Sequence, residues 1–140
     1  MLAIWSASES STHVTQFKAF DDRSYGGFSS CQIEVIGGSN ESRDALKYLK
    51  FSGYLKFNPD IAKKTSTKGS FCGFKGTLNR QLDLRDFEGL ELTLRSNKDL
   101  VFTFNLGMIS LFDGDMYQIG LSVPKSTEWL KYQIPFSLFR

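Results

Sequence analysis

Hydrophobic and polar residues alternate along most of this chain with the period of two that is typical of β-strands. The pattern predicts strands over residues 31–36, 48–57, 70–78, 90–95, 100–106, 116–123 and 129–134. Turn-forming residues such as Asn, Asp, Gly and Pro separate these segments. Because no heptad repeat and no long helical pattern occurs, the sequence predicts an all-β fold.

The phase of the alternation also predicts which side chains face the core. Eight residues hold the inward phase of their strands: Phe51, Phe74, Leu92, Leu94, Phe102, Phe104, Ile119 and Leu121. We expect these side chains to be buried. The short polar turn at 96–99 predicts a hairpin over residues 90–106.

An acidic stretch with two adjacent glycines precedes the strand at 31–36. It reads Asp-Asp-Arg-Ser-Tyr-Gly-Gly-Phe-Ser-Ser over residues 21–30. Glycine adopts positive φ at little cost, which other residues resist. We therefore expect Gly26 or Gly27 to have positive φ, or to lie too close to a neighbour for a Cβ atom.

Composition sets the class of protein but not its chemistry. The 140 residues are 41% hydrophobic and 23% charged, as in an ordinary globular domain, and the 13 Phe residues favour strands. The net charge of +2 is too small to indicate nucleic acid or an anionic membrane as a partner. No apolar stretch reaches the 18 or so residues of a membrane-spanning helix.

Catalytic chemistry finds little support in the sequence. His13, the only histidine, lies in a polar segment away from any acidic pair, and no known catalytic motif or phosphate-binding loop occurs. We therefore expect no enzyme activity and no cofactor. Cys31 and Cys72 lie within predicted strands, as buried free thiols do, and would pair only if their strands were adjacent.

Four short segments carry a family resemblance. They are Asp22 to Ser29, Gly69 to Phe74, Asp83 to Arg95 and Trp129 to Phe136. Their order and spacing resemble the complex I intermediate-associated protein 30 family, whose domain is a galactose-binding-like β-sandwich. The resemblance covers Phe17 to Phe139 and implies a jelly-roll-type sandwich of about eight strands.

The resemblance also implies a domain organisation. A flexible polar lead-in over residues 1–16 would precede a single sandwich domain over 17–140. Family members usually continue with one or two further strands. Two alternatives stay open here: a shortened chain that lacks its last strand, or a sandwich with an open sheet edge.

For function, the resemblance implies a non-catalytic scaffold or assembly factor of an organellar membrane complex. Respiratory complex I in the mitochondrial matrix and a photosystem in the chloroplast are both compatible with it. A carbohydrate-binding module and a stable accessory subunit of such a complex are the alternatives. The expected partners are protein subunits, and aromatic residues near the termini would form the contact surface: Trp5, Phe17, Phe136 and Phe139.

Two further sites follow from properties of galactose-binding-like domains. Such domains often carry a structural calcium ion in an early loop, where Asp21 and Asp22 lie in this chain. They also bind sugars on a sheet face or at loop ends, which makes four residues on or near the central strands candidates for a ligand face: Arg95, Asn105, Tyr117 and Gln118.

Overall fold

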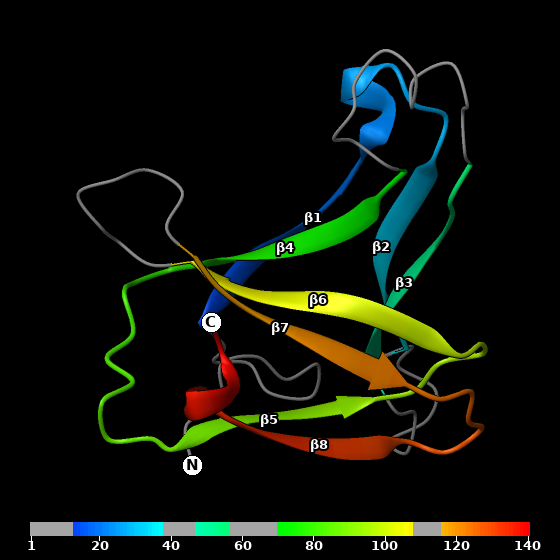
Figure 1. Ribbon diagram of the computed structural model, residues 1–140. Helices are drawn as coiled ribbons and strands as arrows, with labels where there is room; N and C mark the ends of the chain where they lie inside the picture. The colour runs from blue at the N-terminus through cyan, green and yellow to red at the C-terminus, as the bar shows by residue number, and fades with distance from the viewer. Residues whose placement is uncertain (1–12, 38–46, 57–69, 108–115) are drawn as a thin grey trace. The chain divides into compact units, whose positions relative to one another are not determined.

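The structure, a computed structural model, describes residues 13–37, 47–56, 70–107 and 116–140 (Figure 1). Within these ranges the chain is all-β, as the hydrophobic pattern predicts, with eight strands and two short 3₁₀ turns. This is consistent with a β-sandwich; the jelly-roll and galactose-binding-like type stays a prediction. No helix in the described part of the chain is long and apolar enough to cross a bilayer.

The chain divides into two compact units, residues 1–82 (unit 1) and 83–140 (unit 2). The expected single domain over 17–140 stays a prediction beside this division. The described elements of unit 1 are β1 (Val14–Asp21), η1 (Asp22–Tyr25), β2 (Ser30–Ile36), β3 (Tyr48–Tyr54) and β4 (Cys72–Leu78). Strand β1 pairs antiparallel with β4, and β2 pairs antiparallel with β3. Strand β2 also lies against β1 and β4, so the two ladders of unit 1 contact each other.

Unit 2 repeats this nested order of strands (Figure 1). Its described elements are β5 (Gly89–Leu94), β6 (Leu100–Gly107), β7 (Met116–Val123), β8 (Leu130–Pro135) and η2 (Phe136–Leu138). The outer strands β5 and β8 pair with each other, and so do the inner strands β6 and β7. Beyond η2, the N–H and C=O groups of Arg140 exchange hydrogen bonds of 3.0 and 2.8 Å with Gln118 of β7.

The hairpin expected over residues 90–106 is wrong, because β5 and β6 belong to different ladders. Buried Ser96 explains the break: its hydroxyl donates to the Lys98 carbonyl at 2.6 Å and accepts from the Lys98 N–H at 3.2 Å. Ser96 also forms a parallel bridge to Lys125, whose N–H donates to Asp99 Oδ1 at 2.7 Å. These contacts hold the turn against the segment after β7. The chain therefore passes from the β5–β8 ladder to the β6–β7 ladder at this turn.

Strand β1 begins inside the segment expected to be a flexible lead-in. Its pairing with β4 starts at Val14, which lies opposite Leu78. The register then shifts between Val14 and Gln16, as at a β-bulge. This irregularity breaks the period of two, which is why the alternation did not reveal the strand.

The alternation predicts the inward-facing positions of β5, β6 and β7 correctly, but the predicted core residues are less buried than expected. Among the described residues, the buried apolar side chains are Val123, Ile134 and Phe139, all in unit 2. Phe51 and Phe74 of unit 1 remain 40% and 43% exposed. The other six predicted core residues are half-buried: Leu92, Leu94, Phe102, Phe104, Ile119 and Leu121. A two-stranded ladder is too narrow to cover the full inner face of its neighbour, so alternation alone overestimates burial.

Candidate functional site

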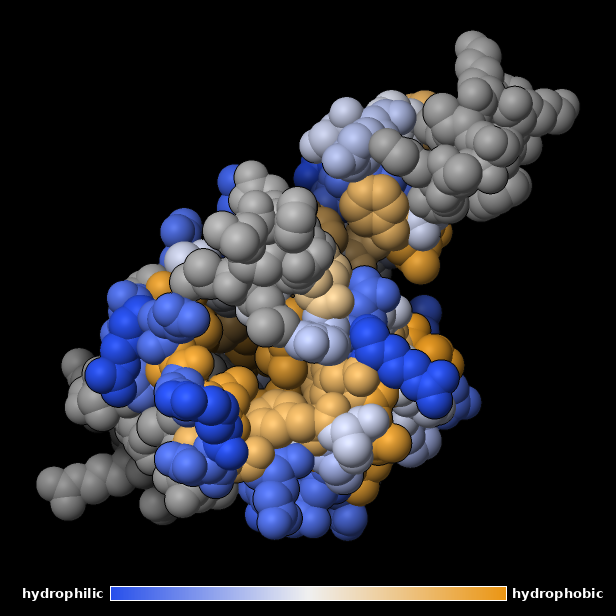
Figure 2. Space-filling model, turned by 60° about the vertical axis from the view of Figure 1, so that its left-hand side comes forward, coloured by the Kyte–Doolittle hydropathy of each residue, from blue (hydrophilic) through white to orange (hydrophobic). Residues whose placement is uncertain are grey.

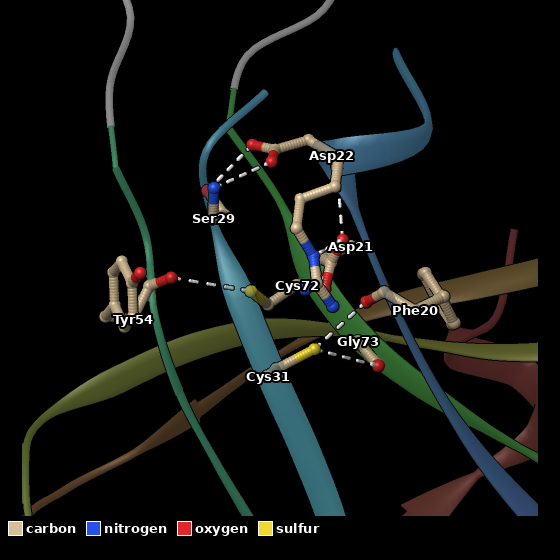
Figure 3. Close-up of polar contacts among 9 residues, drawn as sticks. Phe20, Asp21, Asp22, Ser29, Cys31, Tyr54, Cys72 and Gly73 are labelled. Atoms are coloured by element: carbon tan, nitrogen blue, oxygen red, sulfur yellow. Dashed lines mark hydrogen bonds and ion pairs between the residues drawn. The ribbon is translucent and has the colours of Figure 1, made fainter. Parts of the chain in front are cut away.

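A buried carboxylate organises one end of unit 1. Asp22 is 5% exposed at the start of η1, and Ser29, directly before β2, has no exposed surface. Asp22 Oδ1 accepts from the Ser29 N–H at 2.9 Å, and Oδ2 accepts from the Ser29 hydroxyl at 2.7 Å (Figure 3). The Phe71 N–H, just before β4, donates to Oδ2 at 3.2 Å. One side chain therefore joins η1, the start of β2 and the residue before β4, which is 49 residues away in sequence.

Further hydrogen bonds extend this arrangement to the segment after β3. The Lys56 N–H donates to the Ser29 hydroxyl at 3.1 Å, and the Ser70 hydroxyl donates to the Lys56 carbonyl at 2.7 Å. We call these five residues, Asp22, Ser29, Lys56, Ser70 and Phe71, the Asp22 cluster. No buried side-chain nitrogen or oxygen in the described part of the chain lacks a hydrogen-bond partner. A fully satisfied polar network of this kind rigidifies the elements it joins.

The prediction that Gly26 or Gly27 has positive φ, or lies too close to a neighbour for a Cβ atom, is confirmed. Both glycines contribute to the turn that encloses Asp22. Gly26 caps η1 with a φ of 81°, in the left-handed region. At Gly27 a Cβ atom would overlap the carboxyl group of Asp22, and the Gly27 N–H donates to the Asp22 carbonyl at 2.9 Å. The Asp-x-x-x-Gly-Gly-x-Ser pattern thus describes a carboxylate, the turn around it and its hydroxyl partner.

Exposed aromatic rings surround the Asp22 cluster. Tyr25 is 60% exposed, Phe28 53% and Tyr54 61%. Phe20 is exposed as well, and the Phe71 ring lies 6.4 Å from the Phe20 ring and 5.9 Å from the Tyr25 ring. Figure 2 shows that hydrophobic side chains, in orange, reach the surface of the molecule between hydrophilic ones. We call Phe20, Tyr25, Phe28 and Tyr54 the aromatic rim.

The calcium site expected at Asp21 and Asp22 finds no support in this geometry. Asp21 Oδ1 accepts from the Arg23 N–H at 3.1 Å and from Arg23 Nε at 2.9 Å. The hydrogen bond from the Arg23 side chain lowers the pKa of the Asp21 carboxyl below its usual value. Both oxygens of Asp22 already accept hydrogen bonds. Among the described residues, no group of three or more His, Cys, Asp or Glu side chains could hold a metal ion.

The expected partner-binding residues that the structure describes belong to both units. Trp5 lies outside the described residues. Phe17 is half-buried in unit 1, with its ring 6.2 Å from that of Phe74. Phe139 is only 8% exposed in unit 2, and its ring lies 6.2 Å from the rings of Phe104 and Phe136. Phe139 therefore packs inside its own unit, and the partner role of this set stays a prediction.

Three of the four expected ligand-face residues lie close together in unit 2. Asn105 of β6 and Gln118 of β7 are directly opposite each other, and both are exposed. Tyr117 is the neighbour of Gln118 and is 48% exposed. Arg95 follows β5 near the Ser96–Lys125 bridge, beyond the other end of β7. Its guanidinium lies 4.9 Å from the centre of the Trp129 ring, so it belongs to a separate contact.

A hollow at the other end of the unit 1 ladders was not expected from the sequence. It has a volume of about 290 Å³ and is lined mainly by Val14, Phe17, Ile33, Val35 and Leu49. The Phe74 ring packs 5.2 Å from that of Phe51 in the same unit. These contacts join the β1–β4 ladder to the β2–β3 ladder through apolar side chains.

Sequence reasoning missed the role of Ser29 and of the aromatic rim. The signal for Ser29 was present, because it closes the motif that begins at Asp22. The rim could not be found from alternation, since Tyr25 and Phe28 lie in the turn between β1 and β2. Aromatic residues that flank a glycine pair in a turn were the available clue.

The chain matches the family model of complex I intermediate-associated protein 30 over residues 6–140. No curated protein and no solved structure matches it.

Proposed function

Because the chain belongs to the complex I intermediate-associated protein 30 family, which is associated with complex I assembly, we propose that it is a non-catalytic scaffold that binds subunits of respiratory complex I during assembly. It acts in mitochondria, on the matrix side, and binds its partners through protein–protein contact. The family match over residues 6–140 is the observation that carries this proposal.

The aromatic rim supplies the contact surface. Exposed Tyr and Phe side chains are the residue types that dominate the centres of protein interfaces. The Asp22 cluster holds the turn that presents Tyr25 and Phe28, so these rings are fixed before a partner arrives. A pre-ordered surface binds more tightly than a mobile one, because less conformational entropy is lost on association.

Native gel electrophoresis of the tagged full chain in mitochondrial extract tests this proposal. We expect the chain to co-migrate with an incomplete form of complex I. Phe28→Glu combined with Tyr25→Glu should weaken co-migration at least tenfold, because each change places a charge in an apolar contact. Val101→Glu is the control: Val101 is 79% exposed and belongs to unit 2, so the change adds a charge without altering a rim residue.

Other results separate the alternatives. Co-migration with the mature complex would identify a stable accessory subunit, and co-migration with photosystem intermediates would place the chain in the chloroplast. A chain that stays monomeric in extract would contradict the scaffold proposal. If the Tyr25→Glu, Phe28→Glu double variant binds as the wild type does, the scaffold proposal stands but the aromatic rim is the wrong surface.

A carbohydrate-binding function is the second candidate. It is favoured by the pairing of the two exposed amide side chains, Asn105 and Gln118, across the β6–β7 ladder. Amide groups can both donate to and accept from sugar hydroxyls. A glycan array tests this: binding that is lost in the Asn105→Ala, Gln118→Ala double variant would support it, and no binding to any glycan would reject it.

A further inference from the structure

The only two cysteines of the chain lie where the two ladders of unit 1 meet. Cys31 is in β2, opposite Gly53 of β3, and Cys72 is in β4, opposite Asp21 of β1. The thiols therefore come from different ladders. Both are free and half-buried.

Each thiol contacts a backbone carbonyl of the ladder that contains the other cysteine. Cys31 Sγ lies 3.1 Å from the Phe20 carbonyl oxygen and 3.7 Å from the Gly73 carbonyl oxygen. Phe20 and Gly73 are ladder partners, and Gly73 is the neighbour of Cys72. In return, Cys72 Sγ lies 3.7 Å from the carbonyl oxygen of Tyr54, the residue after Gly53 (Figure 3).

The surroundings of Cys31 are close-packed. At Gly53 a Cβ atom would overlap the Cys31 side chain and the Ser30 carbonyl oxygen, so glycine there makes the space that Cys31 occupies. Burial, together with a hydrogen bond and the charge of Cys31, raises the pKa of the Cys72 thiol to about 12. Cys72 therefore keeps its proton at neutral pH.

We propose that Cys31 and Cys72 form a dithiol site that a peroxide converts into a disulfide linking β2 to β4. This redox modification is independent of the proposed scaffold function. In the first step the Cys31 thiol gives up its proton and its sulfur attacks one peroxide oxygen. The O–O bond breaks, Cys31 becomes a sulfenic acid, and the departing hydroxide takes up the released proton to give the first water. Cys31 takes this step because the raised pKa of Cys72 makes that thiol the poorer source of thiolate.

In the second step Cys72 sulfur attacks Cys31 sulfur. The S–S bond forms, the S–O bond breaks, and the departing hydroxide takes the Cys72 proton to give a second water. Two thiols have then lost two electrons and two protons, and one peroxide has become two waters. The product joins the two ladders of unit 1 covalently, which restricts the unfolded chain and stabilises the folded one.

The test treats the reduced full chain with one equivalent of hydrogen peroxide, blocks remaining thiols with N-ethylmaleimide, and analyses peptides by mass spectrometry. We expect a monomer with a cross-linked peptide pair containing Cys31 and Cys72. Its Tm should rise by about 5–15 °C and return to the starting value after reduction.

Single variants separate the two steps. Cys72→Ser should stop at the sulfenic acid, which dimedone captures on Cys31. Cys31→Ser should leave Cys72 reacting at least tenfold more slowly than Cys31 does in the wild type. Circular dichroism of each variant confirms that the fold is kept. Thiols that both remain free after treatment, or that link only between molecules, would overturn the proposal.

Discussion

Unit 1 and unit 2 pair their four strands in the same nested order, but they bury different chemistry. In the described part of unit 1 the buried side chains are Asp22 and Ser29, both polar. In unit 2 they are Val123, Ile134 and Phe139, together with Ser96. The same pattern of strand pairing can therefore be organised around a hydrogen-bonded carboxylate or around an apolar contact.

The two units also contain the same local turn. In both, an Asp accepts hydrogen bonds from the backbone N–H and side chain of the Arg two residues later: Asp21 with Arg23, and Asp83 with Arg85. This contact lowers the pKa of both carboxyl groups, mainly through the hydrogen bond from the Arg side chain.

The middle residue of the turn distinguishes the units. In unit 1 it is Asp22, buried and hydrogen-bonded to Ser29, and in unit 2 it is half-buried Leu84. The middle position of the turn therefore carries a buried carboxylate in one unit and a half-buried apolar side chain in the other. The predictions below test whether each unit depends on the chemistry that it buries.

Replacing Asp22 should have the largest effect. Asp22→Ala leaves the Ser29 N–H, the Ser29 hydroxyl and the Phe71 N–H without their acceptor, and unsatisfied buried donors are costly. We expect the free energy of unfolding to fall by about 3–5 kcal/mol. Urea denaturation measures this loss. Asp86→Ala, at an exposed acidic residue, is the control, and an equal loss in both variants would mean that the Asp22 cluster has no special role.

Replacing a buried apolar residue of unit 2 should have the next largest effect. Ile134 is 3% exposed, and Ile134→Ala removes buried methyl groups and leaves a cavity. The expected loss of unfolding free energy is about 2–4 kcal/mol. Val101→Ala, at the 79% exposed Val101, should change it by less than about 0.5 kcal/mol in the same denaturation experiment. Similar values for both would show that unit 2 is not held by its apolar contact.

Removing only the hydroxyl of Ser29 should cost less than removing Asp22. Ser29→Ala deletes the donor to Asp22 Oδ2 and the acceptor for the Lys56 N–H, while the Ser29 N–H still reaches Oδ1. We expect a loss of about 1–3 kcal/mol in thermal or urea unfolding. Exposed Ser24 gives the control, Ser24→Ala. A larger loss than that of Asp22→Ala would place the centre of the cluster at Ser29.

The smallest effect should appear only at alkaline pH, and only through unit 1. The pKa of Cys72 is raised to about 12 in the folded chain, mainly by burial, whereas an unfolded thiol ionises near about 8.5. The folded state therefore holds the proton over this range, and stability falls as pH rises from about 9 to 12. In urea titrations across this range, Cys72→Ser should lack that part of the fall. A wild-type slope identical to that of Cys72→Ser would contradict the pKa direction.

The sequence predicted the strands well where alternation is regular. β6 and β7 occur where the pattern predicted them, with Phe102, Phe104 and Ile119 in the inward phase. β1 escaped prediction because its bulge interrupts the alternation. The pairing of β5 was not predicted either. A short turn suggests a hairpin with β6, but β5 pairs with β8, and Ser96 in the turn forms a bridge to Lys125.

The candidate site was predicted in part. The glycine pair indicated a tight turn, and the structure confirms it. The motif did not reveal what the turn encloses, because Asp in a loop is far more often exposed than buried. Neither the hydrogen bond from Phe71 to Asp22 nor the contact of Cys31 with Gly73 has a local signal, since both join residues separated by more than forty positions.

Hydrogen exchange of single backbone amides tests the central comparison most directly. In the wild type we expect the Ser29 and Phe71 amides to be strongly protected, because both donate to Asp22. In Asp22→Ala their protection should fall by at least a hundredfold, while β8 of unit 2 keeps the protection it has in the wild type. Weak protection of Ser29 and Phe71 in the wild type, or an equal loss across both units in the variant, would contradict the account.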